Sequence, residues 1–214
     1  MKILNLYAGI GGNAHNWDRS KHDITAVELN EEIAEEYERL HPSDEVVVGD
    51  AHKFLVDNYE AFDFVWASPP CPSHSSIRKC GSKMGQYESV YPDMKLWQEI
   101  IFLKHYFDGD WVVENVKPFY SDDVRFDKSD LFVRPQSRGR HFYWSSFSIP
   151  NVVVEGQDIH RGNAASWREW LGMDVKSSWS SVEERKVLRN CVHPKVGEAI
   201  LDARKSKQKS LNEV

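Results

Sequence analysis

The sequence has few cysteines, no long apolar run and no excess of positive charge. Its three cysteines stand at positions 71, 80 and 191, an irregular spacing that does not make a disulfide framework. No run approaches the roughly 18 consecutive apolar residues that would span a bilayer, and Met1-Lys2-Ile3 leads into an apolar run without a signal-peptide pattern. These absences argue against a disulfide-stapled secreted protein and against a membrane partner. We therefore expect a reduced protein of the cytoplasm, in a bacterial, archaeal or phage-infected host cell.

The length and the charge of the chain limit the number of domains and the kinds of partner that we expect. A chain of 214 residues fits one α/β domain, or one domain with a small appendage, and needs no disulfide or metal to complete its core. The net charge of −6 argues mildly against a nucleic-acid partner, but the charges are unevenly distributed. Nine acids fall within residues 28–50, whereas residues 64–87 and 131–154 contain no acid and carry several lysines and arginines. Such a division suits a protein whose basic edge faces a phosphate backbone, although charge runs are also typical of ordinary solvated faces.

The first 115 residues alternate short apolar runs with helical patterns. The apolar runs predict strands at 3–7, 24–28, 46–48, 62–66 and 111–114. Helices are expected at 51–58 and 92–107, from Asn30 as the cap to about Leu40, and as a short turn of helix after residues 8–12. Strand–helix alternation at this spacing predicts a Rossmann-like, doubly wound α/β fold with a mostly parallel sheet, whose ligand lies at the carboxyl ends of the strands.

Beyond Pro118 the pattern changes. Residues 120–130 are expected to form an exposed loop, and 131–133 an antiparallel pair with 141–144. Residues 151–186 are rich in Ser and Trp with weak periodicity, and we expect only a short helix there, at 164–171. A last helix is expected at 193–205, followed by a frayed basic tail.

Three successive strand ends carry residues suited to a nucleotide-like ligand. Gly9, Gly11 and Gly12 follow the first strand, where backbone N–H groups approach a ligand without obstruction by a Cβ atom. Glu28 ends the second strand and is placed to accept hydrogen bonds from a ribose diol, and Asp50 follows the third and is placed to accept from an adenine amino group. Each acid alone is equally well explained as a helix cap, and the glycines alone as a tight turn. The succession of all three favours a ligand site.

The fourth strand ends in Ser68-Pro69-Pro70-Cys71, a pattern familiar from enzymes that methylate nucleobases. Amino-group methyltransferases place an aromatic residue after the two prolines, and a cysteine there indicates different chemistry. Carbon 5 of cytosine is not nucleophilic, so a thiolate must first add to C6 to create an enamine. The thiolate needs positive charge nearby, which His74, Arg78 and Lys79 are candidates to supply. The alternatives are a buried structural cysteine and a metal site of Cys71, His74 and Cys80, but the latter lacks a fourth ligand at suitable spacing, so we expect no metal.

The fifth strand ends in Val113-Glu114-Asn115-Val116. An acid that emerges from an apolar strand is costly to bury in its charged form, which raises its pKa. A protonated Glu114 is suited to hydrogen-bond cytosine N3 and to draw electrons from the ring as the thiolate adds. Asn115 would then position its neighbours.

Taken together and in order, these motifs resemble the DNA cytosine-5 methyltransferase family, a group of class I S-adenosylmethionine-dependent methyltransferases. Residues 7–12 are similar to its cofactor loop, with Tyr7 where the family usually has Phe. Pro70-Cys71 resembles the nucleophile motif, with Pro72 in place of the usual Gln, and residues 114–116 resemble the Glu-Asn-Val motif. Residues 136–140 are similar to the Gln-x-Arg-x-Arg motif, and residues 190–194 resemble the closing Gly-Asn motif, although Arg189 stands where Gly is usual.

The resemblance implies a role for each matching residue. Arg140 would contact cytosine O2 and Arg138 a nearby phosphate, beside Cys71 and Glu114 as the other catalytic residues. S-adenosyl-L-methionine is the implied cofactor. The residues implied to hold it are Tyr7, Ala8, Gly9, Gly11, Gly12, Glu28, Leu29, Asp50, Ala51, Pro69 and Asn190. Because Arg189 replaces the usual Gly, the sequence leaves open whether Asn190 contacts the cofactor. It also leaves open whether the protein uses a cofactor variant that carries a group larger than methyl.

The resemblance also indicates that the target-recognition region of this chain is short. Family members with strong sequence specificity insert a large target-recognition domain, whereas the corresponding interval here, 145–188, has only about 44 residues. We therefore expect a catalytic core at 1–144, a reduced target-recognition region at 145–188 and a helix at 189–214 that completes the core. Trp167, Trp170 and Trp179 in this region either belong to the core or stack on an unpaired base.

The expected activity is methylation of carbon 5 of cytosine in DNA, with the base flipped out of the duplex and loose sequence specificity. The family includes a tRNA-methylating branch, so tRNA is the first alternative substrate. A non-catalytic nucleotide-binding module is the second alternative, but a module that only binds needs none of Cys71, Glu114 and Arg140. The sequence does not determine the oligomeric state, for which a monomer is favoured.

Overall fold

A single twisted sheet organises the chain. The computed structural model describes residues 1–86, 88, 93–119, 136–138, 141–156, 162–175 and 179–211. The seven strands lie in the order β3-β2-β1-β4-β5-β7-β6. Their bounds are β1 Lys2–Leu6, β2 Asp23–Glu28, β3 Glu45–Val48, β4 Phe64–Ala67, β5 Asp110–Val116, β6 Gln136–Arg138 and β7 His141–Ser145. Neighbours among β1 to β5 are parallel, and β7 runs antiparallel to both β5 and β6. The predicted doubly wound, mostly parallel α/β fold of class I methyltransferases is therefore confirmed.

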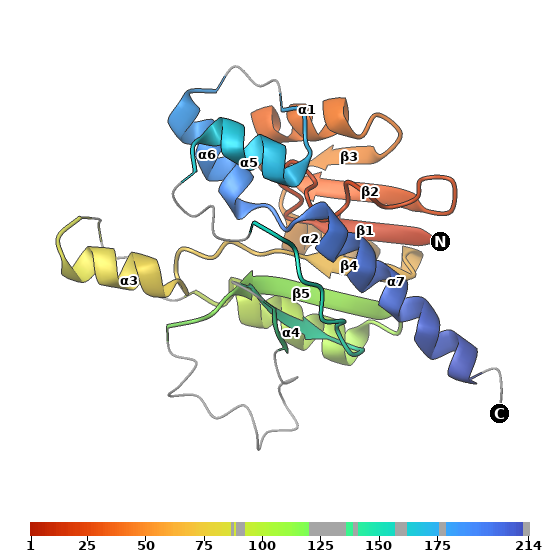
Figure 1. The fold of residues 1–214 in the computed structure, drawn as a ribbon. Coiled ribbons are helices and arrows are strands. Elements are labelled where there is room, and N and C mark those ends of the chain that lie inside the picture. The colour runs from red at the N-terminus through yellow and green to blue at the C-terminus, as the bar shows by residue number, and fades with distance from the viewer. Residues whose placement is uncertain are drawn as a thin grey trace.

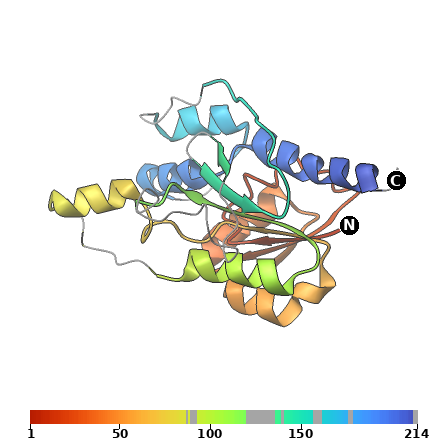
Figure 2. The same ribbon diagram turned by 90° about the horizontal axis from the view of Figure 1, so that it is seen from below.

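Helices cover both faces of this sheet (Figures 1 and 2). The bounds are α1 Glu31–Leu40, α2 Ala51–Asn58, α3 Ser76–Lys83, α4 Lys95–Tyr106, α5 Ala164–Leu171, α6 Ser181–Asn190 and α7 Pro194–Leu211, with a 3-10 turn at Tyr59–Ala61. Side chains alternate between the faces along each strand, so that Ile3 packs in the layer of α7 while Leu4 packs in the layer of α2 and α4. On β7, Tyr143 and Trp144 divide in the same way between the two layers. Burial on both faces explains why these strands are continuous apolar runs.

Several local predictions are confirmed. Helix α1 begins after Asn30, whose side chain accepts a hydrogen bond from the backbone N–H of Ile33, and α2 and α5 have the predicted bounds. The predicted short helix after the glycine loop is wrong, because residues 12–16 form turns. The carbonyls of Ala14, His15 and Trp17 accept hydrogen bonds from Nη1 of Arg19, at 2.7–3.1 Å, and this side chain organises the turns.

Other elements differ from the prediction. Helices α3 and α6 were not expected, and α7 continues to Leu211, through residues expected to fray. The start of α6 has a capping box in which Ser180 and Glu183 exchange hydrogen bonds, a sequence signature that was available. Strand β7 has the expected position. It pairs with β5 on one side, and on the other side with β6, at Gln136–Arg138. The predictions for 120–130 and 131–133 fall outside the described residues.

Helices α5 and α6 pack on the sheet through the glycine loop. Ile10 shares an apolar cluster with Trp167 and Leu171 of α5 and with Leu188 of α6. Trp167 is only 1% exposed, so it belongs to the core and is not available to stack on a base. The division into 1–144, 145–188 and 189–214 stays a prediction.

Candidate active site

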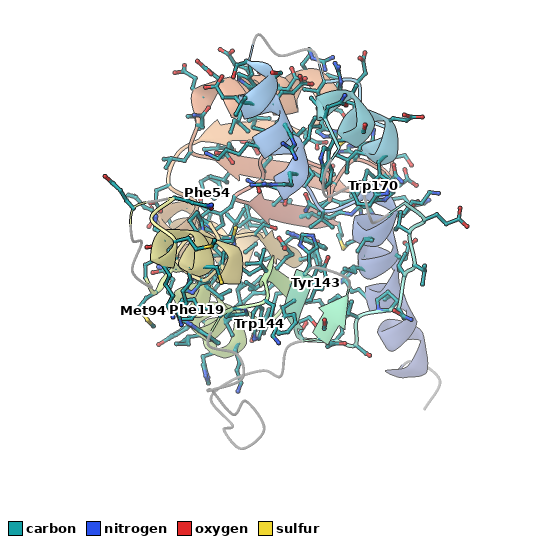
Figure 3. The ribbon with its side chains drawn as sticks, turned by 60° about the vertical axis from the view of Figure 1, so that its left-hand side comes forward. Phe54, Met94, Phe119, Tyr143, Trp144 and Trp170 are labelled. Carbon is teal, nitrogen blue, oxygen red and sulfur yellow. The ribbon has the colours of Figure 1, made fainter. Side chains whose placement is uncertain are left out.

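Five strand ends meet along one edge of the sheet, which we call the carboxyl edge. The register pairs Leu6 with both Val27 and Ala67, and Ala67 with Val113. Val27 pairs in turn with Val47 of β3, so that β1 to β5 end side by side. Figure 1 shows α3 projecting beyond this edge, and Figure 3 views the molecule with that side turned forward. The edge therefore brings together the glycine loop, Glu28, Asp50, the Cys71 loop and Glu114.

Glu28 fastens the glycine loop to the start of α1. Its Oε2 accepts a hydrogen bond from the N–H of Gly9 at 2.9 Å, and its Oε1 accepts from the N–H of Asn30 at 3.0 Å. The N–H of Ala8 donates to the carbonyl of Val27 at 3.1 Å, which holds the loop against β2. One carboxylate therefore positions the loop, a role that sequence reasoning did not assign to it.

The three loop glycines are required for different reasons. A Cβ atom on Gly11 would lie 2.5 Å from Nε2 of His41, and one on Gly12 would lie 2.7 Å from Cβ of Cys191. Both glycines are needed for packing inside the protein. Gly9 has φ +55°, and a Cβ atom there would meet nothing within 4 Å. Among the three, Gly9 is the residue that borders open space.

A buried histidine, His41, supports the glycine loop through a hydrogen bond. His41 Nε2 lies 3.2 Å from the carbonyl oxygen of Ile10, and its Nδ1 lies 3.1 Å from Nη2 of Arg19. Arg19 also forms a two-point ion pair with Asp44, at 3.0 and 2.9 Å. Burial, and next the charge of Arg19, lower the pKa of His41 to about 4, so the ring is neutral near pH 7 and donates from Nε2. No sequence motif marked His41 or Arg19.

Tyr7 joins the loop to a carboxylate on the other face of the sheet. Its hydroxyl donates to Oε1 of Glu99 at 2.5 Å, and His52 Nδ1 lies 3.1 Å from both oxygens of the same carboxylate. Glu99 is completely buried in α4, and its charge adds to burial in raising the pKa of Tyr7. The available signal was an acid within the apolar run of 96–103, Leu-Trp-Gln-Glu-Ile-Ile-Phe-Leu.

Asp50 and Leu29 flank the same end of the edge. Asp50 Oδ1 accepts from the N–H of Lys53 at 2.8 Å, which is the helix-cap role that sequence reasoning kept as an alternative. Its side chain is exposed, and so is Leu29, at 70% of its surface. Ala51 is buried at the first position of α2. An exposed leucine beside an exposed carboxylate provides an apolar surface next to a hydrogen-bond acceptor.

The Cys71 loop is held against the end of β5. Asn115 is 2% exposed, and its Nδ2 donates to the carbonyl of the buried Pro69 at 2.9 Å. Downstream, Ser75 forms an antiparallel bridge with Pro118, and the N–H of Phe119 donates to the carbonyl of His74 at 2.9 Å. Cys71 itself is half-buried and is not part of a disulfide. These contacts place Cys71 at the strand end that carries Glu114.

The suggested sources of positive charge near Cys71 differ in their environments. His74 is fully buried, and burial lowers its pKa although Asp93 lies 3.5 Å away, so the neutral ring is favoured at pH 7. Lys79 is exposed at the surface, with Nζ 3.9 Å from the centroid of the Phe119 ring. The side chain of Arg78 lies outside the described part of the chain.

Glu114 contacts a histidine that sequence reasoning missed. Its Oε1 is hydrogen-bonded to Nδ1 of His141, the first residue of β7. Arg140 and the side chain of Arg138 fall outside the described residues, so their assigned contacts stay predictions. Asn190 is the exposed last residue of α6, and it is Cys191 that packs against the glycine loop.

The sequence matches a known family over most of its length. A family model described as C-5 cytosine-specific DNA methylase matches residues 1–131. The chain belongs to this family. The matched range contains the glycine loop, Cys71 and Glu114, whereas Arg138, Arg140 and Asn190 lie beyond it. No curated protein matches the chain.

Solved structures show weaker similarity to this chain. A DNMT2 variant from Spodoptera frugiperda is 25% identical over 55% of this chain and 36% of its own, with a TM-score of 0.40. A putative methyltransferase, yhhF, from Escherichia coli is 15% identical over 67% of this chain and 73% of its own, also with a TM-score of 0.40. A putative DNA modification methyltransferase from an Escherichia coli prophage is 18% identical over 57% and 35%, with a TM-score of 0.37. The chain thus spans about a third of the DNMT2 structure, and with every TM-score below 0.5 the family assignment depends on the family-model match.

Two kinds of feature are absent from the described residues. No helix there is both long and apolar enough to cross a membrane. No group of three or more His, Cys, Asp or Glu side chains in the same part of the chain is arranged to hold a metal ion.

Proposed function

We propose that this protein transfers a methyl group to carbon 5 of cytosine in DNA through a covalent bond between Cys71 and C6. The observation that supports this most directly is the hydrogen bond from Asn115 to the carbonyl of Pro69. It ties the Cys71 loop to the residue next to Glu114, so that a nucleophile and a carboxyl group lie at the same carboxyl edge of the sheet. A nucleotide-binding module without catalysis needs no such arrangement.

The carboxyl edge fits S-adenosylmethionine, the cofactor that the family implies. Gly9 borders open space, and Glu28 holds the N–H of Gly9 in place. Leu29 and Asp50 offer an apolar surface and a hydrogen-bond acceptor. Tyr7, Ala8, Gly11, Gly12, Ala51, Pro69 and Asn190 complete the proposed binding set, several of them as support for the loop. When bound, the cofactor supplies the methyl group.

The chain's own residues prepare the base. The Cys71 thiolate attacks C6, the C5–C6 double bond shifts to C4–C5, and N3 takes the electron pair and a proton from Glu114. By resemblance, Arg140 binds cytosine O2 and Arg138 a phosphate. Carbon 5, made nucleophilic by this shift, would take the methyl group that the bound cofactor supplies. A base that the sequence does not identify then removes the C5 proton, which restores the C5–C6 double bond and releases the thiolate.

DNA is the proposed substrate, read with loose sequence specificity of one to three bases. Each well-read base pair contributes about 1–3 kcal/mol of discrimination and needs ordered side chains in a groove. Within 145–188, the apolar side chains of helices α5 and α6 pack against the glycine loop. Few residues of this region are therefore left to contact base edges. Methylation of tRNA would use the same chemistry, so tRNA is included as a substrate in the experiment below.

The test uses the full chain with S-adenosylmethionine and three substrates: duplex DNA, single-stranded DNA and tRNA, each containing 5-fluorocytosine. We expect a covalent adduct with DNA, none with Cys71→Ser, and 5-methylcytosine by nucleoside mass spectrometry when ordinary cytosine is used. An adduct with tRNA alone would transfer the proposal to the RNA branch. A Cys71→Ser protein as active as the parent would exclude the mechanism. Bisulfite sequencing of the methylated DNA gives the specificity, and confinement to one motif of four or more fixed bases would contradict loose reading.

A further inference from the structure

His141 stands beside the carboxyl group on which the proposed reaction depends. Its Nδ1 is hydrogen-bonded to Oε1 of Glu114. Both side chains are largely withdrawn from solvent, with 16% of His141 and 8% of Glu114 exposed. The low exposure strengthens a hydrogen bond between them, because little water competes for either partner.

The sheet holds this pair in place. In the antiparallel register of β5 and β7, Glu114 lies opposite Tyr143 and Val116 lies opposite His141. Residues alternate in the direction of their side chains, so all four share one face, and His141 is the diagonal neighbour of Glu114. The ring of Tyr143 is 1% exposed, and its centroid lies 6.3 Å from that of the His141 ring. The next residue along β5, Asn115, points to the opposite face, where it anchors the Cys71 loop.

We propose that His141 is a positioning residue for Glu114 in cytosine methylation, an inference that rests on the proposed function. His141 donates its Nδ1 proton to Oε1 and thereby orients the carboxyl group with Oε2 toward the base. Oε2 carries the proton that N3 receives as the bond between Sγ of Cys71 and C6 forms. Glu114 is then a carboxylate, and the hydrogen bond from His141 becomes charge-assisted. The proton returns from N3 to Oε2 when the thiolate leaves, and His141 keeps its own proton throughout.

This role predicts a stronger interaction in the transition state than in the free protein. A hydrogen bond between neutral groups gains strength when its acceptor becomes an anion. Interactions of that kind accelerate the chemical step instead of tightening substrate binding. Loss of the Nδ1 donor is therefore expected to slow adduct formation and to leave the affinity for DNA almost unchanged.

Two substitutions separate this role from simple packing. His141→Asn keeps an N–H donor near the position of Nδ1, whereas His141→Leu fills similar space without a donor. His105→Leu is the matched control, because His105 is an exposed residue near the end of α4. Each variant is examined by urea unfolding, by fluorescence anisotropy with DNA, and by the single-turnover rate of adduct formation on 5-fluorocytosine DNA.

We expect His141→Leu to slow adduct formation about 10- to 100-fold, the effect of one hydrogen bond to a charged group. His141→Asn should recover most of that rate, and DNA affinity should change less than about threefold in both. Adduct formation by His141→Leu at the parent rate would overturn the inference, and so would equal rates for the Asn and Leu variants. A parent protein that forms no adduct with any substrate would instead remove the proposed function itself.

Discussion

The hydroxyl of Tyr7 donates a 2.5 Å hydrogen bond to the carboxylate of Glu99, across 92 positions of sequence. Tyr7 belongs to the glycine loop and Glu99 to a helix on the opposite side of β1, so the bond connects the proposed cofactor site to the core. It also explains why a tyrosine suits a position where the family usually has phenylalanine. A fully buried carboxylate requires donors, and Tyr7 and His52 provide them.

The first prediction concerns this bond. Tyr7→Phe leaves Glu99 with one donor fewer, and we expect the free energy of unfolding to fall by about 1.5–3 kcal/mol. Urea unfolding measures the change. Tyr59→Phe is the matched control, because the hydroxyl of Tyr59 donates to the exposed Glu60 at 3.3 Å, and there we expect a change below about 0.5 kcal/mol. Equal losses of stability at the two positions would show that the hydrogen bond to Glu99 contributes no more stability than an exposed one.

Gly9→Ala and Gly12→Ala should have different effects. At Gly12 a Cβ atom would meet Cβ of Cys191 and the carbonyl of Val192, both at 2.7 Å, and overpacking of this kind costs about 1–3 kcal/mol of stability. At Gly9 the cost is about 1–2 kcal/mol for the left-handed backbone, with no clash in the free protein. The added methyl group at Gly9 borders the space proposed for the cofactor. Calorimetric titration with S-adenosylmethionine should therefore show a larger loss of affinity for Gly9→Ala, and a larger loss for Gly12→Ala would count against this placement.

Asn115→Asp should loosen the Cys71 loop. The substitution keeps the size of the side chain, but it replaces the donor to the carbonyl of Pro69 with an oxygen that repels it. We expect adduct formation on 5-fluorocytosine DNA to slow by at least about 10-fold, the equivalent of 1.4 kcal/mol, while cofactor affinity stays near that of the parent. Asn58→Asp removes a comparable 2.9 Å donor to the exposed helical carbonyl of Phe54 and should leave the rate unchanged. Unaltered adduct formation by Asn115→Asp would mean that the loop is positioned by other contacts.

The pH dependence of stability should report on His41. Its pKa is lowered from 6.5 to about 4 by burial first and the Arg19 charge second. Between these values the unfolded chain binds a proton that the folded protein does not, so stability is complete above about pH 6.5 and is lost as the pH falls toward 4. The contribution of His41 over this range is about 3 kcal/mol.

Urea unfolding at pH 7, 6, 5 and 4 tests this contribution. His41→Asn should flatten the dependence relative to the parent, whereas His105→Asn, at an exposed position, should not. Because burial also lowers the pKa of His15, His74 and His193, the variant should retain part of the slope. Parallel curves for the parent and His41→Asn would contradict the neutral, hydrogen-bonded state of this ring.

The strands and capped helices of the first half could be predicted because their signals are local. Apolar runs with polar turns between them indicate where β1 to β5 lie. Asn30 and Asp50 are N-cap residues directly before the helical patterns of α1 and α2. The order of Gly9, Glu28, Cys71 and Glu114 along the chain was enough to predict that they share one edge, because parallel strands end on the same side. Helix α6 was not predicted, because the apolar periodicity of its region is weak, although Ser180 and Glu183 form a capping box at its start.

The partners of these residues were decided only by the tertiary structure. Arg19 organises the turns where a helix was expected, Asn115 reaches Pro69 across 46 positions, and His141 reaches Glu114 across 27. Periodicity and caps carry information over a few residues, whereas these contacts depend on which strands become neighbours and in what register. The sequence by itself therefore determined β1 to β5, the capped helices α1 and α2, the edge and the proposed nucleophile. The packing of the sheet decided which buried groups hold the loop, the cysteine and the carboxylate in place, because each of those bonds joins residues that only the strand order brings together.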